Sequence, residues 1–148
     1  MVLEETTRIE APRERVFGFF QQMDERRYLD WHPDHIAFRW VGGEEAAEGN
    51  VFYLEEHIRG KVNKQEMRYE KVKPDHYIEF APTWWFYRLF LPRVSFALEE
   101  KNGDATLLRQ QVQVRIGPIG KWLNRREFEA VQQHMKEEGD NLKRMMEA

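Results

Sequence analysis

The sequence contains no cysteine, no long hydrophobic run and no excess of basic residues. Without cysteine there can be no disulfide, thiolate nucleophile or cysteine metal site, so histidine and carboxylates are the common metal ligands that remain. No stretch is long enough to span a bilayer, and the alternating N-terminus does not resemble a signal peptide. Because the net charge is -3 and both signs are interleaved, nucleic acid is not an expected partner. These absences predict a cytoplasmic protein.

The chain has 148 residues, which is the length of one domain, and we expect a single domain over residues 1–148. Aromatic residues make up 14% of the sequence, which is high for a soluble protein. This content predicts a large interior or an interior lined by aromatic side chains.

Alternating apolar and polar residues, separated by turn-forming groups, predict an antiparallel meander after a first strand and one or two short helices. A long helix, from about Lys121 to Met146, is expected to close the chain. The predicted strands are 2–9, 36–41, 51–58, 65–72, 77–80, 93–99 and 105–116.

This order of elements, together with Ile-Glu-Ala-Pro at 9–12 and Val-Phe-Gly-Phe at 16–19, resembles the START-like superfamily, also called SRPBCC or the polyketide cyclase/dehydrase superfamily. The resemblance covers nearly the whole chain. It implies an α+β helix-grip fold, in which a curved antiparallel sheet wraps around the last helix and two short helices follow the first strand. It also implies a ligand cavity between sheet and helix, with a hydrophobic or aromatic small molecule as the partner.

The last predicted helix carries two polar residues within its apolar stripe. At about 100° per residue, His134 and Glu138 fall in the same arc as Phe128, Met135 and Leu142. A carboxylate in a dry interior is costly unless it is paired. We therefore expect a metal ion, a cationic side chain or a wet cavity beside the pair.

Two further residues are candidates to complete a metal site. His35 follows Pro33 in a segment whose irregular backbone could aim the imidazole into a cavity mouth. On the strand 51–58, Glu56 lies on the more apolar face, but a shift of one residue would place Glu55 there instead. Two His and two carboxylates suit Zn, Mn or Fe, and Zn is our first choice.

Residues 28–35, residues 56–60 and the pair on the last helix together resemble the diacetylphloroglucinol hydrolase family. This local resemblance implies hydrolytic cleavage of a carbon–carbon bond in an acylated phenol by a zinc enzyme. The zinc ligands that it implies are His35, Glu56, His134 and Glu138. Tyr28 and His32 are the catalytic candidates, as proton donors or as partners of a substrate phenolate, and Tyr87 is an alternative.

Residues 82–92 concentrate aromatic side chains. They could form the wall or lid of a cavity for a flat apolar ligand, or a homodimer contact, or a loop that touches a membrane. As ligand-binding candidates we take Trp84, Trp85, Tyr87 and Phe90.

Three functions are consistent with the sequence. The preferred one is a metal-dependent hydrolase or lyase acting on a small aromatic or polyketide-like compound. The second is a non-catalytic carrier of a hydrophobic molecule. The third is a metal-free polyketide cyclase or dehydratase in which Glu138 or Glu56 acts as the base.

Overall fold

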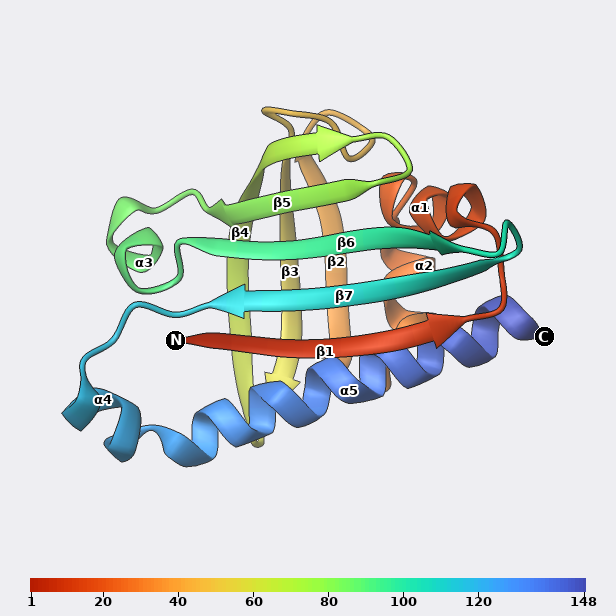
Figure 1. Ribbon diagram of the computed structural model, residues 1–148. Helices are drawn as coiled ribbons and strands as arrows, with labels where there is room; N and C mark the ends of the chain where they lie inside the picture. Colours follow the sequence, from red (N-terminus) through yellow and green to blue (C-terminus); the bar gives the residue numbers. More distant parts are fainter.

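The computed structural model describes all 148 residues and contains seven strands and five helices (Figure 1). In chain order the elements are β1 (Val2–Ile9), α1 (Arg13–Gln21), α2 (Glu25–Trp31), β2 (His35–Gly42), β3 (Val51–Ile58), β4 (Lys61–Lys73), β5 (Tyr77–Pro82), α3 (Trp85–Phe90), β6 (Arg93–Lys101), β7 (Ala105–Gln113), α4 (Pro118–Leu123) and α5 (Arg125–Glu147).

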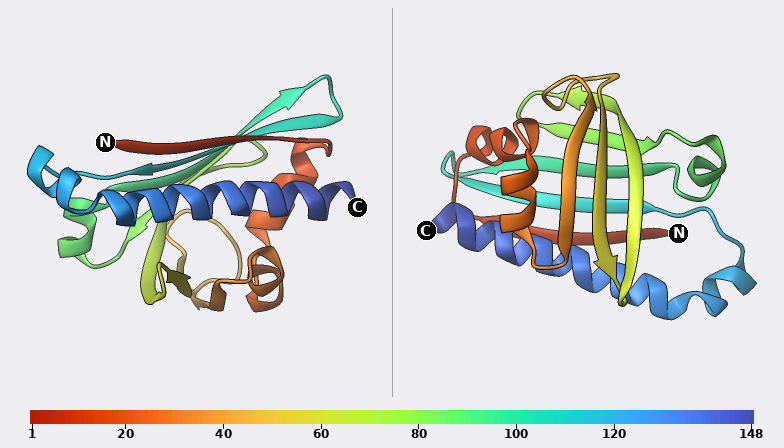
Figure 2. Two further views of the ribbon diagram at one scale, coloured as in Figure 1. Left: turned by 90° about the horizontal axis from the view of Figure 1, so that it is seen from below. Right: turned by 180° about the vertical axis from the view of Figure 1, so that it is seen from behind.

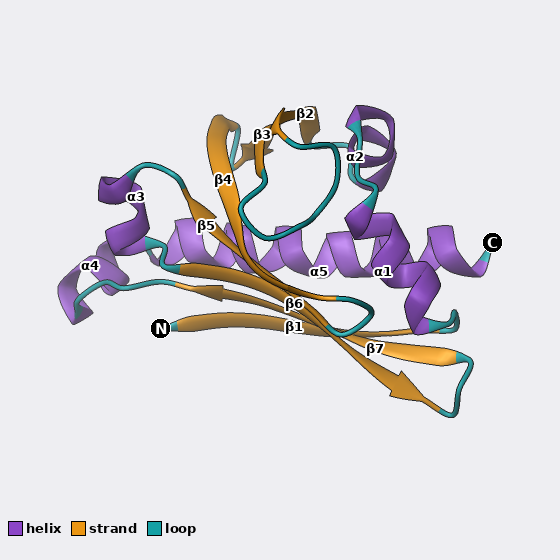
Figure 3. Cartoon of the chain, turned by 90° about the horizontal axis from the view of Figure 1, so that it is seen from above, coloured by secondary structure: helices purple, strands orange, loops and turns teal.

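The strands form one antiparallel sheet in the order β1-β7-β6-β5-β4-β3-β2. The sheet curves around α5, which contacts both β1 and β3 (Figure 2). Helices α1 and α2 connect β1 to β2, which are the two edge strands of the sheet (Figure 3). This arrangement confirms the predicted α+β helix-grip architecture, with its long C-terminal helix and two short helices after the first strand.

Residues that adopt a left-handed backbone close two of the hairpins. Arg59 and Gly60 connect β3 to β4 with φ values of 55° and 74°. Asn102 and Gly103 connect β6 to β7 with φ values of 55° and 78°. Positive φ at two successive positions fits the right-handed twist of the flanking strands. The first of these turns sets the register in which Glu56 of β3 lies opposite Asn63 of β4.

Helix α5 approaches the sheet closely at Gly139. A Cβ atom there would collide with the Thr7 side chain on β1 and would lie 3.1 Å from Nε2 of Gln110 on β7. The buried Gln110 amide donates a hydrogen bond of 3.0 Å to the carbonyl of Met135 on α5. The absence of a side chain at Gly139 therefore fixes the depth at which α5 lies in the sheet.

The core is rich in aromatic rings, as the composition predicts. Phe20 of α1 stacks on Phe96 of β6 with ring centroids 4.5 Å apart, and Trp31 contacts both rings. A second group of rings, from Phe38, Phe52, Tyr69 and Phe80, packs along the concave face of β2 to β5. No helix combines the length and apolar character that crossing a bilayer would require.

The strand predicted at 105–116 ends at Gln113, and the strand predicted at 65–72 spans Lys61–Lys73. Two further differences concern helices. The last helix begins at Arg125, because α4 is a separate short helix that ends at Leu123, and Asn124 lies between the two helices. Residues 85–90, for which no element was expected, form α3. Both differences lie at the end of the molecule where β6 begins and β7 ends.

Candidate metal centre and ligand cavity

Four polar side chains from three elements meet beside α5. His35 begins β2 and lies opposite Glu56 of β3 in the strand register. His134 and Glu138 lie one turn apart on α5, and both face inward. The strand pairing and the helical spacing thus bring together the four residues that the sequence predicted as ligands.

The distances among these four side chains suit a tetrahedral ion. Nε2 of His134 lies 3.3 Å from Nε2 of His35, 3.3 Å from Oε2 of Glu56 and 3.4 Å from Oε2 of Glu138. Nε2 of His35 lies 2.9 Å from Oε2 of Glu138 and 3.7 Å from Oε2 of Glu56. Ligands about 2.0–2.1 Å from a tetrahedral Zn²⁺ lie about 3.3–3.4 Å from one another. The four residues therefore fit a metal ion at their centre.

The tautomer of His35 also suits a metal ligand. Its Nδ1 lies 2.6 Å from the backbone carbonyl of Tyr28, which can only accept a hydrogen bond, so Nδ1 carries the proton. In a neutral ring the lone pair is then on Nε2, the atom that faces the other three side chains. A hydrogen bond from the second ring nitrogen to a carbonyl is the usual way in which proteins orient a metal-binding histidine.

Without an ion, protons must compensate the charges of this cluster. Burial alone would lower the pKa of His134, but its hydrogen bonds to Glu138 and Glu56 and their charges raise the pKa to about 10. Burial alone would raise the pKa of Glu138, but hydrogen bonds from His134 and His35 hold it below its usual range. Without an ion, the cluster is thus ion-paired, with the His134 imidazolium held by the carboxylates of Glu138 and Glu56.

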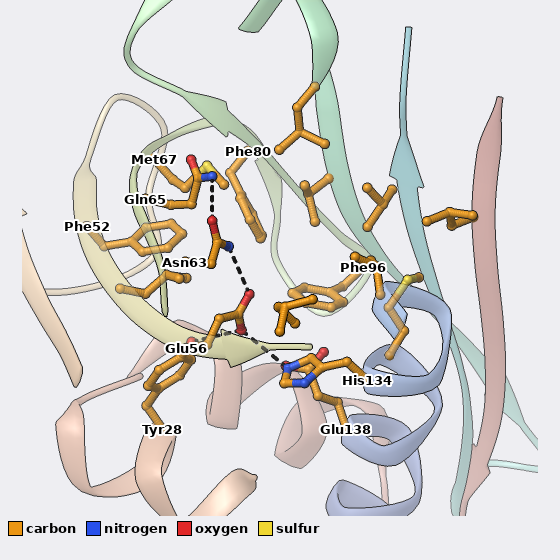
Figure 4. A pocket seen from close by; sticks show the side chains of 18 of the residues that line it. Tyr28, Phe52, Glu56, Asn63, Gln65, Met67, Phe80, Phe96, His134 and Glu138 are labelled. Carbon is orange, nitrogen blue, oxygen red and sulfur yellow. Dashed lines mark hydrogen bonds and ion pairs between the residues drawn. The ribbon is translucent and has the colours of Figure 1, made fainter. Parts of the chain in front are cut away.

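Tyr28 is the protic side chain that joins the cluster to the cavity (Figure 4). Its hydroxyl donates a hydrogen bond of 3.2 Å to Oε2 of Glu56, and its ring stacks on His35 with centroids 3.8 Å apart. Burial, followed by the charges of Glu56 and Glu138, raises the pKa of Tyr28 above its ordinary value. The hydroxyl therefore stays protonated and is available as a donor.

A cavity of about 350 Å³ lies between the sheet and α5. Of its 27 lining residues 22 are hydrophobic, so its wall suits an apolar molecule. The main polar groups of the lining are Tyr28, Glu56, Asn63, Gln65, His134 and Glu138. They form one row, so a ligand in the cavity meets an apolar wall and one polar side.

Asn63 and Gln65 extend the cluster along β4, and the sequence analysis did not identify them. Nδ2 of Asn63 donates to Oε1 of Glu56 at 3.4 Å, and Nε2 of Gln65 donates to Oδ1 of Asn63 at 3.1 Å (Figure 4). Oε1 of Gln65 is buried and has no hydrogen-bond partner. The available signal was the alternation of β4, which places both amides on the face that carries Met67 and Tyr69.

His32 lies beside the cluster but does not line the cavity. The backbone N–H of Asp34 donates to its Nδ1 at 2.9 Å, and its Nε2 therefore donates to Oε1 of Glu137, also at 2.9 Å. The His32 ring packs on that of His134, with centroids 4.2 Å apart. Because both nitrogens are occupied, this geometry suits a role in positioning His134 rather than the proton-donating role that the sequence suggested.

Three of the aromatic ligand-binding candidates lie outside the cavity. Trp84, Trp85 and Tyr87 are exposed around α3, whereas Phe90 is among the cavity-lining residues. A helix of six residues at the surface directs most of its side chains to solvent. Because of the position of α3, the side chains of Trp84, Trp85 and Tyr87 do not line the cavity, contrary to the prediction.

The choice between the two adjacent glutamates is clear in the structure. Glu56 lines the cavity, and Glu55 lies on the opposite face of β3, where Oε1 is 3.9 Å from Nζ of Lys64. No arginine or lysine forms an ion pair with Glu138, whose side-chain partners are His35 and His134.

The family of Activator of Hsp90 ATPase homolog 1-like proteins matches residues 10–147. No curated protein sequence matches the chain. Among solved structures, KanY protein has a TM-score of 0.77 at 11% identity, with 100% of this chain and 98% of that chain covered.

Two further structures extend the comparison. A START superfamily protein from Mycobacterium smegmatis has a TM-score of 0.72 at 14% identity, covering 99% of this chain and 97% of that one. The ZhuI aromatase/cyclase from Streptomyces sp. R1128 has a TM-score of 0.74 at 15% identity, covering 99% and 93%. These likenesses confirm the START-like fold, and the resemblance to the diacetylphloroglucinol hydrolase family stays a prediction.

Proposed function

The chain belongs to the family of Activator of Hsp90 ATPase homolog 1-like proteins. Within this family we propose that it is a metal-dependent hydrolase or lyase. Its substrate is a small aromatic or polyketide-like carbonyl compound. Since one fold hosts many functions, the proposal rests on the site rather than on the family. The observation that carries it is the tetrahedral spacing of His35, Glu56, His134 and Glu138 beside an apolar cavity.

The ligand set favours Zn, with Mn or Fe as alternatives, because two imidazoles and two carboxylates are borderline to hard donors. The His35 tautomer supports the same reading, since its Nδ1–H···O=C bond leaves Nε2 free to coordinate. When bound, the ion would supply Lewis-acid chemistry, which polarises a substrate carbonyl and lowers the pKa of a water molecule.

The reaction that fits this site is the hydrolysis of an aryl ketone. Water is added across the bond between the ring carbon and the acyl carbon: the acyl carbon takes the hydroxyl and leaves as a carboxylic acid, and the ring carbon takes the proton. Tyr28 is the nearest protic donor, and its raised pKa keeps the hydroxyl protonated. We assign to it the donation of a hydrogen bond or proton to the substrate oxygen or ring.

The row of polar groups supports a hydroxylated substrate. Oε1 of Gln65 has no partner within the protein, and a phenolic hydroxyl is a donor of the kind that it lacks. Asn63 holds Gln65 in position and is itself bonded to Glu56. The apolar wall opposite would hold the ring and keep bulk water away from the cluster.

The carrier function remains a second candidate, because most of the cavity wall is hydrophobic and the polar cluster satisfies its own hydrogen bonds. In this case the cluster would hydrogen-bond the polar end of a bound molecule. A metal-free cyclase or dehydratase, with Glu138 or Glu56 as the base, would use the same cavity. Both alternatives differ from the first proposal in needing no metal.

Elemental analysis of the purified, untagged protein distinguishes the metal-dependent enzyme from the two metal-free alternatives. We expect about one zinc per chain, as in a mononuclear four-ligand site, and loss of that zinc in His134→Ala and Glu138→Gln. His57→Ala is the matched control, because His57 is an exposed residue of β3 that faces away from the cluster. Anomalous scattering at the zinc edge would place the ion. A metal-free wild-type protein that binds an aromatic reporter would contradict the enzyme proposal and favour the carrier.

Activity is tested on acylated phenols by following release of the carboxylic acid. Tyr28→Phe removes only the hydroxyl, so we expect it to keep its zinc and to lose activity by roughly 10²–10⁴-fold, the usual contribution of general acid–base catalysis. Full activity of this variant would remove Tyr28 from the reaction. Zinc binding without turnover of any compound in such a panel would argue against this substrate class.

A further inference from the structure

The end of the molecule that carries α3 and α4 exposes an unusual amount of apolar surface. Six large apolar residues between positions 84 and 90, together with Ile119, Trp122 and Leu123, are exposed. They are nine of the thirteen large hydrophobic residues that are exposed in the whole chain. Trp85 is 67% exposed and Trp122 is 64% exposed. Patches of this kind mark an interaction surface.

The same two segments carry only positive charge. Residues 82–93 and 115–126 contain six basic residues and no acidic residue. The chain has 23 basic and 26 acidic residues, so the remainder has 17 basic against 26 acidic residues. These two segments therefore carry six positive charges close to exposed aromatic rings, in a chain whose net charge is -3.

Most of these cations are free to meet a partner. Arg88 pairs with Glu70, and Arg93 lies 3.4 Å from Glu79. The other four, Arg115, Lys121, Arg125 and Arg126, are exposed and form no ion pair. The Arg125 guanidinium lies 5.2 Å from the Trp122 ring centre, which brings a charge and an aromatic ring to one place.

The two helices lie at the same end of the molecule in both views (Figures 1 and 2). The backbone N–H of Arg115 donates to the carbonyl of Phe90 at 2.8 Å, which ties the segment before α4 to the end of α3. Phe90 and Phe128, from the last residue of α3 and the first turn of α5, also line the cavity. The surface formed by residues 84–90 and 115–126, here named the α3–α4 surface, thus borders the apolar cavity.

We propose that the α3–α4 surface docks on an anionic lipid bilayer. Tryptophan, tyrosine and phenylalanine next to Arg and Lys are the residues that favour the boundary between headgroups and acyl chains. Basic residues close to such a boundary are attracted by the charge of anionic lipids. Docking would place the border of the cavity against the bilayer, from which an apolar ligand could enter.

Charge argues against the other obvious occupant, a second copy of the chain. A two-fold symmetric contact through the α3–α4 surface would bring the five basic residues of one copy against the same five of its partner. An anionic bilayer is complementary both to these charges and to the exposed rings. This inference does not depend on the metal or on the proposed reaction.

The test is pelleting of the full chain with vesicles of phosphatidylcholine, with and without phosphatidylglycerol. We expect binding only when phosphatidylglycerol is present, loss of binding at high salt and a blue shift of tryptophan fluorescence on binding. The triple variant Lys121→Gln, Arg125→Gln, Arg126→Gln should bind about a hundredfold more weakly, because each basic residue near an anionic surface contributes about 1 kcal/mol.

The matched control removes the same charge elsewhere, with Arg26→Gln, Lys71→Gln and Lys73→Gln, all exposed positions away from the surface. We expect it to bind as the wild type does. A second variant, Trp85→Ser with Trp122→Ser, should reduce the blue shift, because only Trp84 then remains at the surface, and should weaken binding. Equal loss in both triple variants, no binding of the wild type to anionic vesicles, or a dimer in solution that Trp85→Ser dissociates would each overturn the proposal.

Discussion

The cluster beside α5 and the α3–α4 surface depart from the usual distribution of residues in opposite directions. In the cluster, two histidines and two carboxylates are withdrawn from solvent. At the α3–α4 surface, large aromatic side chains are left in solvent. Both features lower the stability of the free protein. Buried charges lose their hydration, and exposed aromatic rings do not gain the free energy of burial. Regions that bury polar residues or expose large apolar residues at a cost in stability are the regions where a functional site is expected.

The stability of the protein should depend strongly on the zinc ion proposed for the cluster beside α5. Removal of zinc by a chelator is expected to lower the free energy of unfolding by about 4 kcal/mol when free zinc had been about a thousand times its Kd. Thermal unfolding with and without chelator measures this change. His134→Ala serves as the reference, because its unfolding temperature should not respond to the chelator. An identical response in both proteins would mean that zinc acts elsewhere.

The depth of α5 in the sheet can be tested at Gly139. Gly139→Ala places a methyl group against Thr7 and close to Gln110, so we expect a loss of about 1–3 kcal/mol, as for other overpacked positions. Gly18→Ala on α1 is the control, since no atom lies within 4 Å of its added Cβ. It should instead gain about 0.5–1 kcal/mol from helix propensity. Chemical denaturation measures both values, and equal effects would contradict the close approach of α5.

The charge state of the cluster predicts how zinc binding depends on pH. The pKa of His134 is raised to about 10 in the metal-free protein, so its ring is protonated at neutral pH and must lose that proton to coordinate. Zinc affinity should therefore rise about tenfold per pH unit for each proton released, equivalent to about 1.4 kcal/mol. Calorimetry in buffers of different ionisation enthalpy counts the protons.

The stability of the metal-free protein should change in the opposite direction. Because the folded pKa of His134 lies above its unfolded value of 6.5, its contribution is complete below about pH 6.5. It is lost as the pH rises toward 10. An affinity for zinc that is independent of pH would contradict this charge state.

Periodic patterns account for the part of this structure that could be predicted from sequence. Helical spacing identified His134 and Glu138 because one face of a long helix must turn inward. Strand alternation favoured Glu56 over Glu55, but only the hairpin register at Arg59 and Gly60 settles which of them faces the cavity. The amides of Asn63 and Gln65 were missed for a similar reason, because both faces of β4 contain polar residues.

The aromatic segment could not be placed from its composition. Whether a short aromatic segment such as residues 84–90 is buried or exposed depends on whether the rest of the fold leaves apolar surface for it to cover. That depends on tertiary packing and cannot be read from local sequence. α3 is a helix of six residues beside a cavity whose wall is already filled by rings from the strands. Its tryptophans therefore remain at the surface, and only the last ring, Phe90, reaches the lining.

The smallest expected effect concerns these exposed rings. Trp85→Ser and Trp122→Ser should each change the free energy of unfolding by no more than about 0.5 kcal/mol, because the rings are mostly exposed and touch little. Phe52→Ala in the sheet should cost about 3–5 kcal/mol, since that ring is buried among Phe38, Tyr69 and Phe80. If denaturation shows the two tryptophans to be as costly as Phe52, the α3–α4 surface supports the fold. If it shows them to be nearly neutral, these rings have no structural role in the free protein, which leaves a partner as the physical reason for their exposure.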